Sequence, residues 1–217
     1  MRPIVSIVGK SDSGKTALLE SLIVELKRRS RKVATIKHDA KHGFELDKVG
    51  KDSWRLSQAG SDVVVLGSPS KFAFFKQVEH DLSPQELSCF IGWDYDLILT
   101  EGYKRSSTLK IEVHRKEQGK DLLCSPQQLL AVVTDEPLEI DVPQFAGDEV
   151  QKIVDLIEDR LLAQGSGEEV DLFVNDAPVP VKEFVNDFIA KTLLGMVSVL
   201  KGVKEVKSLH ISLRRRF

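Results

Sequence analysis

An apolar run, a loop bounded by glycines and a segment with helical periodicity follow one another directly near the N-terminus. The apolar run is residues 4–8, and the loop reads Gly9-Lys10-Ser11-Asp12-Ser13-Gly14-Lys15-Thr16. The loop fits G-x-x-x-x-G-K-[ST], a pattern in which backbone N–H groups surround phosphate oxygens. The segment after it has apolar residues at helical spacing, which are Leu18, Leu19, Leu22, Ile23 and Leu26. This order is the context that the pattern requires, so the chain is predicted to bind a nucleotide by its phosphates.

Each residue type in the loop has a chemical reason to be there. Gly9 and Gly14 let the backbone turn tightly, and the helix that begins near Lys15 adds its positive N-terminal end. The Lys15 ammonium is expected to lie between the two outer phosphates, which makes it a catalytic candidate. The Thr16 hydroxyl is expected to bind Mg²⁺. All eight residues from Gly9 to Thr16 are therefore candidate phosphate-binding residues.

The composition is that of an ordinary globular chain, and it argues against some partners. Of the 217 residues, 41% are hydrophobic and 29% are charged, as in typical soluble domains. The net charge of −2 gives no general positive field, so no nucleic-acid partner is expected. No stretch is long and apolar enough for a membrane span. The two cysteines, Cys89 and Cys124, are far apart in the sequence and fit a reducing compartment, so a cytoplasmic location is predicted. The basic run at residues 27–32 is expected to be the solvated end of the first helix.

Apolar runs and helix-like segments alternate up to about residue 162. Strands are expected at residues 32–37, 62–67, 72–75, 97–100, 110–114 and 130–134, and helices at residues 52–59 and 84–90. A further helix is expected to run to about residue 162 from a capping box formed by Asp148 and Gln151. The alternation predicts an α/β fold with a mainly parallel sheet and helices on both faces. Because such sheets bind ligands at the carboxyl ends of their strands, the loops after residues 36, 100 and 134 are expected to share one mouth with the glycine loop.

A polar, glycine-containing break at residues 164–169 separates a smaller C-terminal part. We predict a nucleotide-binding domain at residues 1–164, a linker at residues 165–169 and a small α+β domain at residues 170–217. Strands are expected at residues 170–174 and 206–213, with a turn at residues 178–180 and a helix along the apolar stripe from Phe184 to Leu200. The closing Arg214-Arg215-Arg216 is either a solubilising tail or a contact to a phosphate-bearing partner.

Polar residues that follow predicted strands supply candidates for a metal site and an anion site. Glu101 follows one strand at the expected mouth and is a catalytic candidate as well as a candidate Mg²⁺ ligand. Asp39 follows another strand and joins Thr16 and Glu101 as a third candidate Mg²⁺ ligand. Four residues are candidates for binding an anionic substrate or partner, namely Lys37, His38, Lys104 and Arg105.

Two further features each allow two interpretations. His38 and His42 have the spacing of a metal pair on a helix, whereas the adjacent Gly43 favours a loop that faces phosphate or substrate. Asp135 closes a predicted strand, where its carboxylate can accept two N–H groups from guanine and so select GTP over ATP. In the alternative interpretation, Asp135 opens the turn before Pro137.

These residues together resemble the family of molybdopterin-guanine dinucleotide biosynthesis protein B, abbreviated MobB. The resemblance covers roughly residues 1–163 and rests on segments in a consistent order, which are residues 9–16, 37–39, 47–53, Arg55 with Ala59-Gly60, 96–104 and 131–138. It implies a P-loop NTPase fold and a homodimer that binds GTP with Mg²⁺. It also implies an accessory role in molybdenum cofactor biosynthesis, in which the protein assists MobA, the guanylyltransferase that joins GMP to molybdopterin. On this interpretation the chain is at most a weak GTPase.

Two features depart from the family pattern, and two other functions stay open. The segment after Gly165-Ser166-Gly167 is absent from the shorter members, so its role is not implied by the resemblance. Lys10 has the spacing of a lysine that acts across a dimer in some NTPases, although Ser11-Asp12 replaces the usual Gly-Gly. One alternative is a P-loop small-molecule kinase, which the loop and the nearby cations would suit. The other is a nickel or cobalt insertion GTPase, for which the chain lacks a His-rich tract.

Overall fold

The computed structural model describes residues 2–39, 49–92, 94–119, 121–162, 168, 170–175 and 177–213. These residues form two compact units, one from Arg2 to Glu158 and one from Asp159 onwards. Most of the linker predicted at residues 165–169 lies outside the described residues, so the linker stays a prediction. No helix in the described part of the chain is long and apolar enough to cross a membrane.

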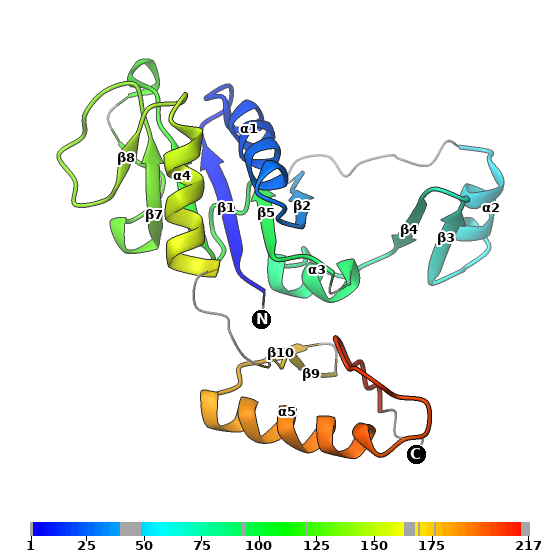
Figure 1. Cartoon of the computed structure of the whole chain (residues 1–217). Helices are drawn as coiled ribbons and strands as arrows, with labels where there is room; N and C mark the ends of the chain where they lie inside the picture. The colour runs from blue at the N-terminus through cyan, green and yellow to red at the C-terminus, as the bar shows by residue number, and fades with distance from the viewer. Residues whose placement is uncertain are drawn as a thin grey trace. The chain divides into compact units, whose positions relative to one another are not determined.

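The first unit is built on a six-stranded sheet (Figure 1). Its strands are β1 (Ile4–Gly9), β2 (Val33–Lys37), β5 (Leu97–Glu101), β6 (Leu109–Val113), β7 (Leu129–Val133) and β8 (Gln144–Phe145), in the order β2-β5-β1-β6-β7-β8. Every neighbouring pair is parallel. The carboxyl ends of all these strands therefore lie at one edge of the sheet, which is where the predicted mouth should be.

Helices α1 (Lys15–Arg28) and α4 (Val150–Ile157) lie side by side against this sheet (Figure 1). Their apolar stripes are fully buried at Leu22, Leu26, Ile153 and Ile157. A π-helical turn, η3 (Glu158–Leu162), continues α4. Helix α3 (Pro84–Ile91) packs Leu87 against a buried cluster of sheet residues that includes Ile4, Ile36 and Ile98. The parallel sheet and its helices confirm the predicted fold class.

The C-terminal end of α1 is tied to α4 by Arg29. The Arg29 guanidinium donates to Glu25 at 2.7 Å, to Asp155 at 2.5 Å and to Glu158 at 2.9 Å. Only 19% of the Arg29 side chain is exposed. The prediction that the basic run at residues 27–32 is solvated is therefore wrong for Arg29, because α4 brings carboxylates to it.

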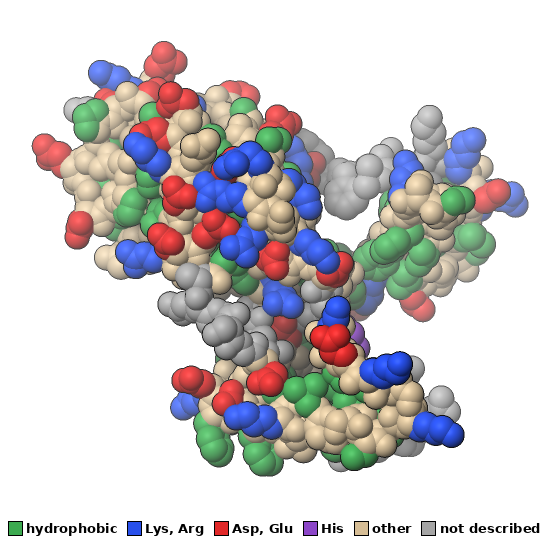
Figure 2. Space-filling model, viewed as in Figure 1, with side chains coloured by type: hydrophobic (Ala, Val, Ile, Leu, Met, Phe, Trp, Pro, Cys, Tyr) green, Lys and Arg blue, Asp and Glu red, His purple; other side chains and the backbone are tan. Residues whose placement is uncertain are grey.

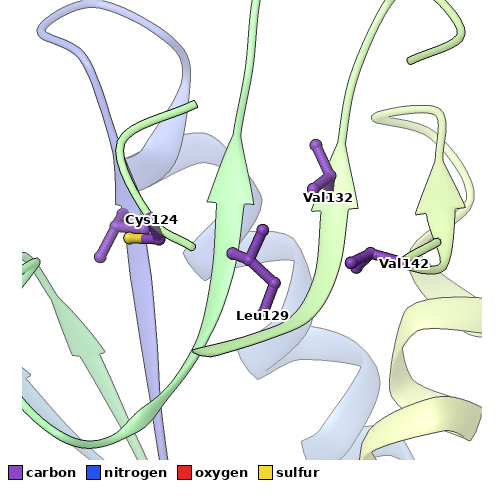
Figure 3. Close-up of a cluster of buried hydrophobic side chains, with 5 residues drawn as sticks. Cys124, Leu129, Val132 and Val142 are labelled. Atoms are coloured by element: carbon purple, nitrogen blue, oxygen red, sulfur yellow. The ribbon is translucent and has the colours of Figure 1, made fainter. Parts of the chain in front are cut away.

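A second part of the core lies around β7 and contains a cysteine. Cys124, Leu129, Val132 and Val142 form a buried cluster together with Val8 (Figure 3). Burial, together with the charge of Glu112, raises the pKa of the Cys124 thiol to about 11, so the thiol stays protonated and unreactive. Both Cys124 and Cys89 are free thiols.

Residues 52–76 form a short helix followed by a separate β-hairpin. Helix α2 (Asp52–Gln58) precedes strands β3 (Val63–Gly67) and β4 (Phe72–Lys76), which pair antiparallel with each other. Apolar side chains stay exposed on both strands, with 60% of Val65 and 76% of Phe72 accessible. Figure 2 shows hydrophobic side chains gathered over this hairpin. Exposed apolar surface is typical of protein interaction sites.

The second unit contains a short hairpin and one long helix. Strands β9 (Leu172–Val174) and β10 (Ala177–Val179) pair antiparallel, and α5 (Glu183–Ser198) follows them. The turn predicted at residues 178–180 is wrong, because Pro178 pairs within β10; proline is tolerated there since both strands of a two-stranded sheet are edges. The strand predicted at residues 206–213 is also wrong, because these described residues join no sheet.

The sequence predicts a capping box at α4, but the structure has one at α3. Helix α4 begins after Glu149, and no side chain caps it. At α3, the Ser83 hydroxyl accepts the Glu86 backbone N–H at 3.2 Å, and the Glu86 carboxylate accepts the Ser83 backbone N–H at 2.8 Å. The prediction at Asp148 and Gln151 is therefore wrong, since the spacing of residue types alone does not fix where a helix begins.

Candidate nucleotide-binding site

The phosphate loop, defined as Gly9 to Thr16, connects β1 to α1. Gly14 has a φ of 94° and Asp12 a φ of 59°, so the loop folds back through two left-handed residues. Gly9 has no room for a side chain, because a Cβ there would lie 2.6 Å from the Ser13 Oγ and 2.6 Å from the Val113 carbonyl oxygen. The glycines of the sequence pattern are therefore required by this backbone.

Polar atoms of the loop are suited to an anion. The Lys15 Nζ donates across the loop to the Lys10 carbonyl oxygen at 2.5 Å. The Ser13 Oγ is buried and has no hydrogen-bond partner among the described residues. Helix α1 begins at Lys15 and presents its positive end to the loop. A phosphate group would give the Ser13 hydroxyl an acceptor and the Lys15 ammonium a further one, so the residues present fit such a ligand.

The candidate magnesium ligands Thr16 and Glu101 are in contact. The Thr16 hydroxyl donates to the Glu101 Oε2 at 2.8 Å. The Lys37 Nζ lies 3.4 Å from the Glu101 Oε1, and 14% of the Glu101 side chain is exposed. Because Mg²⁺ prefers oxygen ligands, this pair fits the ion. Asp39, the third candidate, is exposed just beyond β2.

His38 is held beside Glu101 by its backbone and its ring. The His38 backbone N–H donates to the Glu101 carbonyl oxygen at 3.0 Å. Its ring stacks on Tyr103 with 4.3 Å between centroids, and its Nε2 lies 2.9 and 3.0 Å from the two Asp81 carboxylate oxygens. Burial, together with the Asp81 charge, raises the pKa of the Tyr103 hydroxyl to about 12, so Tyr103 is neutral. The structure therefore brings His38 to the mouth, with one ring nitrogen already engaged by a carboxylate.

The other candidate anion-binding residues, Lys104 and Arg105, are exposed just after β5. They follow Glu101 in the turn that also contains Tyr103, whose φ of 57° is left-handed. The Ser106 backbone N–H donates to the Tyr103 carbonyl oxygen at 2.9 Å and closes this turn. The two cations therefore belong to a defined turn at the carboxyl edge of the sheet, and their roles stay predictions.

Asp135 lies just beyond β7 and is bound by the segment that follows β6. The Asp135 Oδ1 accepts the Lys116 backbone N–H at 3.0 Å, and the Oδ2 lies 4.0 Å from the Arg115 Nη1. The Lys116 N–H, with a smaller effect of the Arg115 charge, lowers the pKa of the Asp135 carboxyl. The carboxylate is therefore an acceptor at neutral pH, with 44% of the side chain exposed. Its contact with guanine stays a prediction.

Two residues at the phosphate loop are missing from the sequence-based predictions. The Arg115 Nε donates to the Ser13 carbonyl oxygen at 3.1 Å, and the Gln118 Nε2 donates to the Ser11 carbonyl oxygen at 2.7 Å. The rule that ligand-binding residues follow parallel strands could have identified Arg115, because it comes just after β6. Gln118 lies in the 3₁₀ turn η1 (Lys116–Gln118), for which the sequence has no comparable signal.

Two further predictions about this site stay untested. Among the described residues, no group of three or more His, Cys, Asp or Glu could hold a metal ion. His42 lies outside the described residues, so the histidine pair stays a prediction. The Lys10 Nζ donates to the Gln118 carbonyl oxygen of its own chain, and its role across a dimer also stays a prediction.

Comparison with known families and proteins gives a consistent set of relatives. The family described as molybdopterin guanine dinucleotide synthesis protein B, MobB, matches residues 4–135. The molybdopterin-guanine dinucleotide biosynthesis adapter protein of Haemophilus influenzae is 41% identical over 160 residues, which are 73% of this chain and 89% of that protein. The Escherichia coli protein of the same name is 32% identical over 162 residues, 72% of this chain and 92% of that protein.

Relatives differ in how much of this chain they match. A crystal structure of molybdopterin-guanine biosynthesis protein B is 30% identical with a TM-score of 0.53, and the match covers 72% of this chain and 98% of that one. In contrast, a protein of Methanocaldococcus jannaschii is 29% identical over 238 aligned positions, and this match covers 97% of both chains. The match with the Methanocaldococcus jannaschii protein therefore spans nearly the whole chain, whereas the other matches span about three quarters of it.

Proposed function

Because the chain belongs to the MobB family, we propose that it is a GTP-binding adapter in molybdenum cofactor biosynthesis. It assists a MobA-like guanylyltransferase in converting molybdopterin to molybdopterin guanine dinucleotide. The relatives are named adapter proteins of molybdopterin-guanine dinucleotide biosynthesis, which supports this role. The chain itself is at most a weak GTPase, so its main activity is binding. The two free cysteines suit a reducing compartment, and we place this activity in the cytoplasm.

One observation carries the proposal: the phosphate loop and the Thr16–Glu101 pair meet at the carboxyl edge of a parallel sheet. The loop and Lys15 would hold the triphosphate, and Thr16 and Glu101, with Asp39 nearby, would hold Mg²⁺. The ion would supply positive charge, which offsets the negative charge of the phosphates.

The cations around this edge would suit an anionic pterin. Lys37 lies beside Glu101, and Lys104 and Arg105 are exposed after β5. Molybdopterin carries a phosphate, for which exposed cations are the usual protein partners. We propose that these residues, together with His38, contact molybdopterin or the guanylyltransferase.

Replacing Lys15 tests the proposal directly. In the variant Lys15→Ala, we expect GTP-Mg²⁺ affinity to fall by about a hundredfold, because the phosphates lose their charged partner. Titration calorimetry measures this, with Lys27→Ala as the matched control; Lys27 lies exposed in the last turn of the same helix. Wild-type protein that binds no GTP, or a Lys15→Ala variant that binds GTP as the wild type does, would contradict the proposal.

The same loop and cations also suit a P-loop kinase, which is the alternative. A kinase would transfer the γ-phosphate of a nucleotide to an acceptor in a rapid, repeated reaction. An assay of phosphate transfer to pterins and nucleosides separates the two functions. Rapid turnover of any acceptor would replace the adapter proposal, whereas binding without turnover agrees with it.

We propose that Asp135 recognises guanine. Its charged carboxylate can accept the two N–H groups of the guanine edge, which adenine does not offer. We expect GTP to bind more tightly than ATP, and the variant Asp135→Asn to lose that preference. Equal affinity for both nucleotides in the wild-type protein would contradict this proposal and leave Asp135 with its contact to the Lys116 N–H.

We propose that the chain forms a homodimer through the β3–β4 hairpin. The family resemblance that implies a dimer covers roughly residues 1–163, and the hairpin is an exposed apolar surface within them. The variant Phe72→Ser should shift the protein towards monomer in sedimentation equilibrium, because it removes a large side chain of this surface. Val199→Ser, at a similarly exposed apolar position of the second unit, should not. A wild-type protein that is monomeric would contradict the proposal.

A further inference from the structure

The segment from Arg115 to Gln118, here called the β6 segment, makes several contacts with the phosphate loop. The Arg115 Nε donates to the Ser13 carbonyl oxygen at 3.1 Å. The Gln118 Nε2 donates to the Ser11 carbonyl oxygen at 2.7 Å. In the opposite direction, the Lys10 Nζ donates to the Gln118 carbonyl oxygen. Two of these contacts hold carbonyl oxygens of the loop itself.

Holding a carbonyl oxygen fixes where the next N–H group points. In a trans peptide the C=O and the N–H lie in one plane and point in opposite directions, and no peptide bond described here is cis. With the Ser13 carbonyl bound to Arg115, the Gly14 N–H is directed away from Arg115. With the Ser11 carbonyl bound to Gln118, the Asp12 N–H is likewise directed away from Gln118. The two bonds therefore set the directions of two N–H groups in the loop.

The β6 segment is itself held in place. Its η1 turn is closed by a hydrogen bond from the Gln118 N–H to the Arg115 carbonyl oxygen at 2.9 Å. The Lys116 N–H is bound by the Asp135 carboxylate at 3.0 Å. The guanidinium also packs closely on the loop, since a Cβ at Gly14 would lie 3.3 Å from the Arg115 Nη2. A segment that is itself anchored thus contacts a loop whose two glycines would otherwise leave it with many conformations.

We propose that Arg115 and Gln118 are positioning residues that preorganise the phosphate loop for the nucleotide. They fix the peptide planes between Ser11 and Asp12 and between Ser13 and Gly14 before the ligand arrives, so less ordering is left to binding. Neither side chain needs to touch the nucleotide. This inference rests on the proposed function, because it concerns the same phosphate site.

The test compares three ligands with Mg²⁺: inorganic triphosphate, GDP and GTP. The variant Arg115→Met keeps a long side chain but has no N–H donor, and Gln118→Met does the same at the second position. We expect Arg115→Met to weaken all three ligands by a similar factor of about ten, and Gln118→Met by a factor of about three. Titration calorimetry gives the three affinities for each variant.

Two controls separate positioning from charge and from stability. Lys116→Gln removes one positive charge from the same segment. The Lys116 side chain is exposed and its Nζ lies 3.8 Å from the Glu136 carboxylate, so all three affinities should stay near wild type. Arg29→Ala breaks the α1–α4 ion pairs and should lower the melting temperature without weakening the ligands. If Arg29→Ala weakened all three ligands as Arg115→Met does, the effect of Arg115 would be one of stability and the inference would fail.

The ligand series also separates failure of this inference from failure of the proposed function. Variants that bind all three ligands as the wild type does would overturn the inference alone. Loss confined to GDP and GTP, with inorganic triphosphate unchanged, would also overturn it, because it would show direct contact with the nucleoside. Wild-type protein that binds none of the three would overturn the proposed function and this inference together.

Discussion

At the scale of single residues, Glu101 offers the sharpest test of the candidate magnesium site. Its carboxylate accepts the Thr16 hydroxyl at 2.8 Å and faces the Lys37 ammonium at 3.4 Å. In Glu101→Gln, GTP affinity in the presence of Mg²⁺ should fall about tenfold, because the ion loses a charged oxygen ligand. With EDTA present, the variant and the wild type should bind GTP equally. Nucleotide titrations with and without Mg²⁺ measure both effects.

The matched control for this prediction is Asp94→Asn. Asp94 precedes β5, whereas Glu101 ends that strand. The Asp94 side chain is 89% exposed and its carboxylate pairs with Lys32. Its removal should leave GTP affinity unchanged with or without Mg²⁺. An equal loss in Glu101→Gln whether or not Mg²⁺ is present would mean that Glu101 acts on the loop and not on the ion.

The residues of this site differ in how far the sequence could predict them. Lys15 and Thr16 lie within one local pattern, and Glu101 follows a strand, so spacing and strand order were enough to select them. Arg115 follows a strand too, so the same rule could have selected it, but its contact with the Ser13 carbonyl oxygen is seen only in the structure. Asp81 could not be selected, because it contacts His38 from the segment between β4 and α3, 43 residues further along the chain. Contacts between distant loops leave no periodic signal in the sequence.

At the scale of elements, the pair formed by α1 and α4 should be sensitive to acid. Hydrogen bonds from Arg28 and Arg29 hold the pKa of Glu25 at about 2, below its ordinary value of 4.5. A carboxyl with a lowered pKa in the folded state stabilises that state above pH 4.5, and loses this contribution as the pH falls towards 2. Glu25→Gln should therefore lower the melting temperature by a few degrees at pH 7.

The difference between wild type and Glu25→Gln should shrink as the pH falls through the range from 4.5 to about 2. Thermal unfolding followed by circular dichroism at several pH values measures it. Glu20→Gln, at an exposed carboxylate of the same helix, is the control and should have little effect at any pH. A difference between wild type and Glu25→Gln that stays constant down to pH 2 would contradict the assigned cause.

Strands were predicted best where the apolar sequence run has a neighbouring strand to pair with in the structure. The buried runs of β1, β5 and β7 were found because a parallel sheet covered on its faces needs continuous apolar strands. The alternation at residues 206–213 resembles a strand equally well, yet these described residues join no sheet. Pro178 reads as a turn residue, but β9 supplies a partner for it. A local pattern thus specifies which secondary structures a segment can form, and the neighbouring segments determine which of them it forms.

At the scale of the whole molecule, the candidate nucleotide site lies within one of the two units, and several relatives match only part of this chain. The Haemophilus influenzae protein is matched over 89% of its length by 160 residues of this chain. The solved structure at 30% identity is matched over 98% of its length by 72% of this chain. Every residue that we assign to the nucleotide site lies in the first unit, from Arg2 to Glu158. The site should therefore be complete without the second unit.

Deletion of residues 163–217 is accordingly expected to leave GTP affinity unchanged. The shortened chain keeps Glu158, whose carboxylate binds Arg29 and Arg31, so α1 and α4 should stay joined. Calorimetric titration with GTP-Mg²⁺ and a thermal melt of both chains measure this. A deletion from residue 150 onwards is the contrasting control: it also removes the fully buried Ile153 and Ile157 of α4 and should prevent folding. A shortened chain that still melts cooperatively at the temperature of the full chain but has lost GTP affinity would contradict this expectation. The second unit would then contribute to the site, and the assignment of the site to the first unit alone would be wrong.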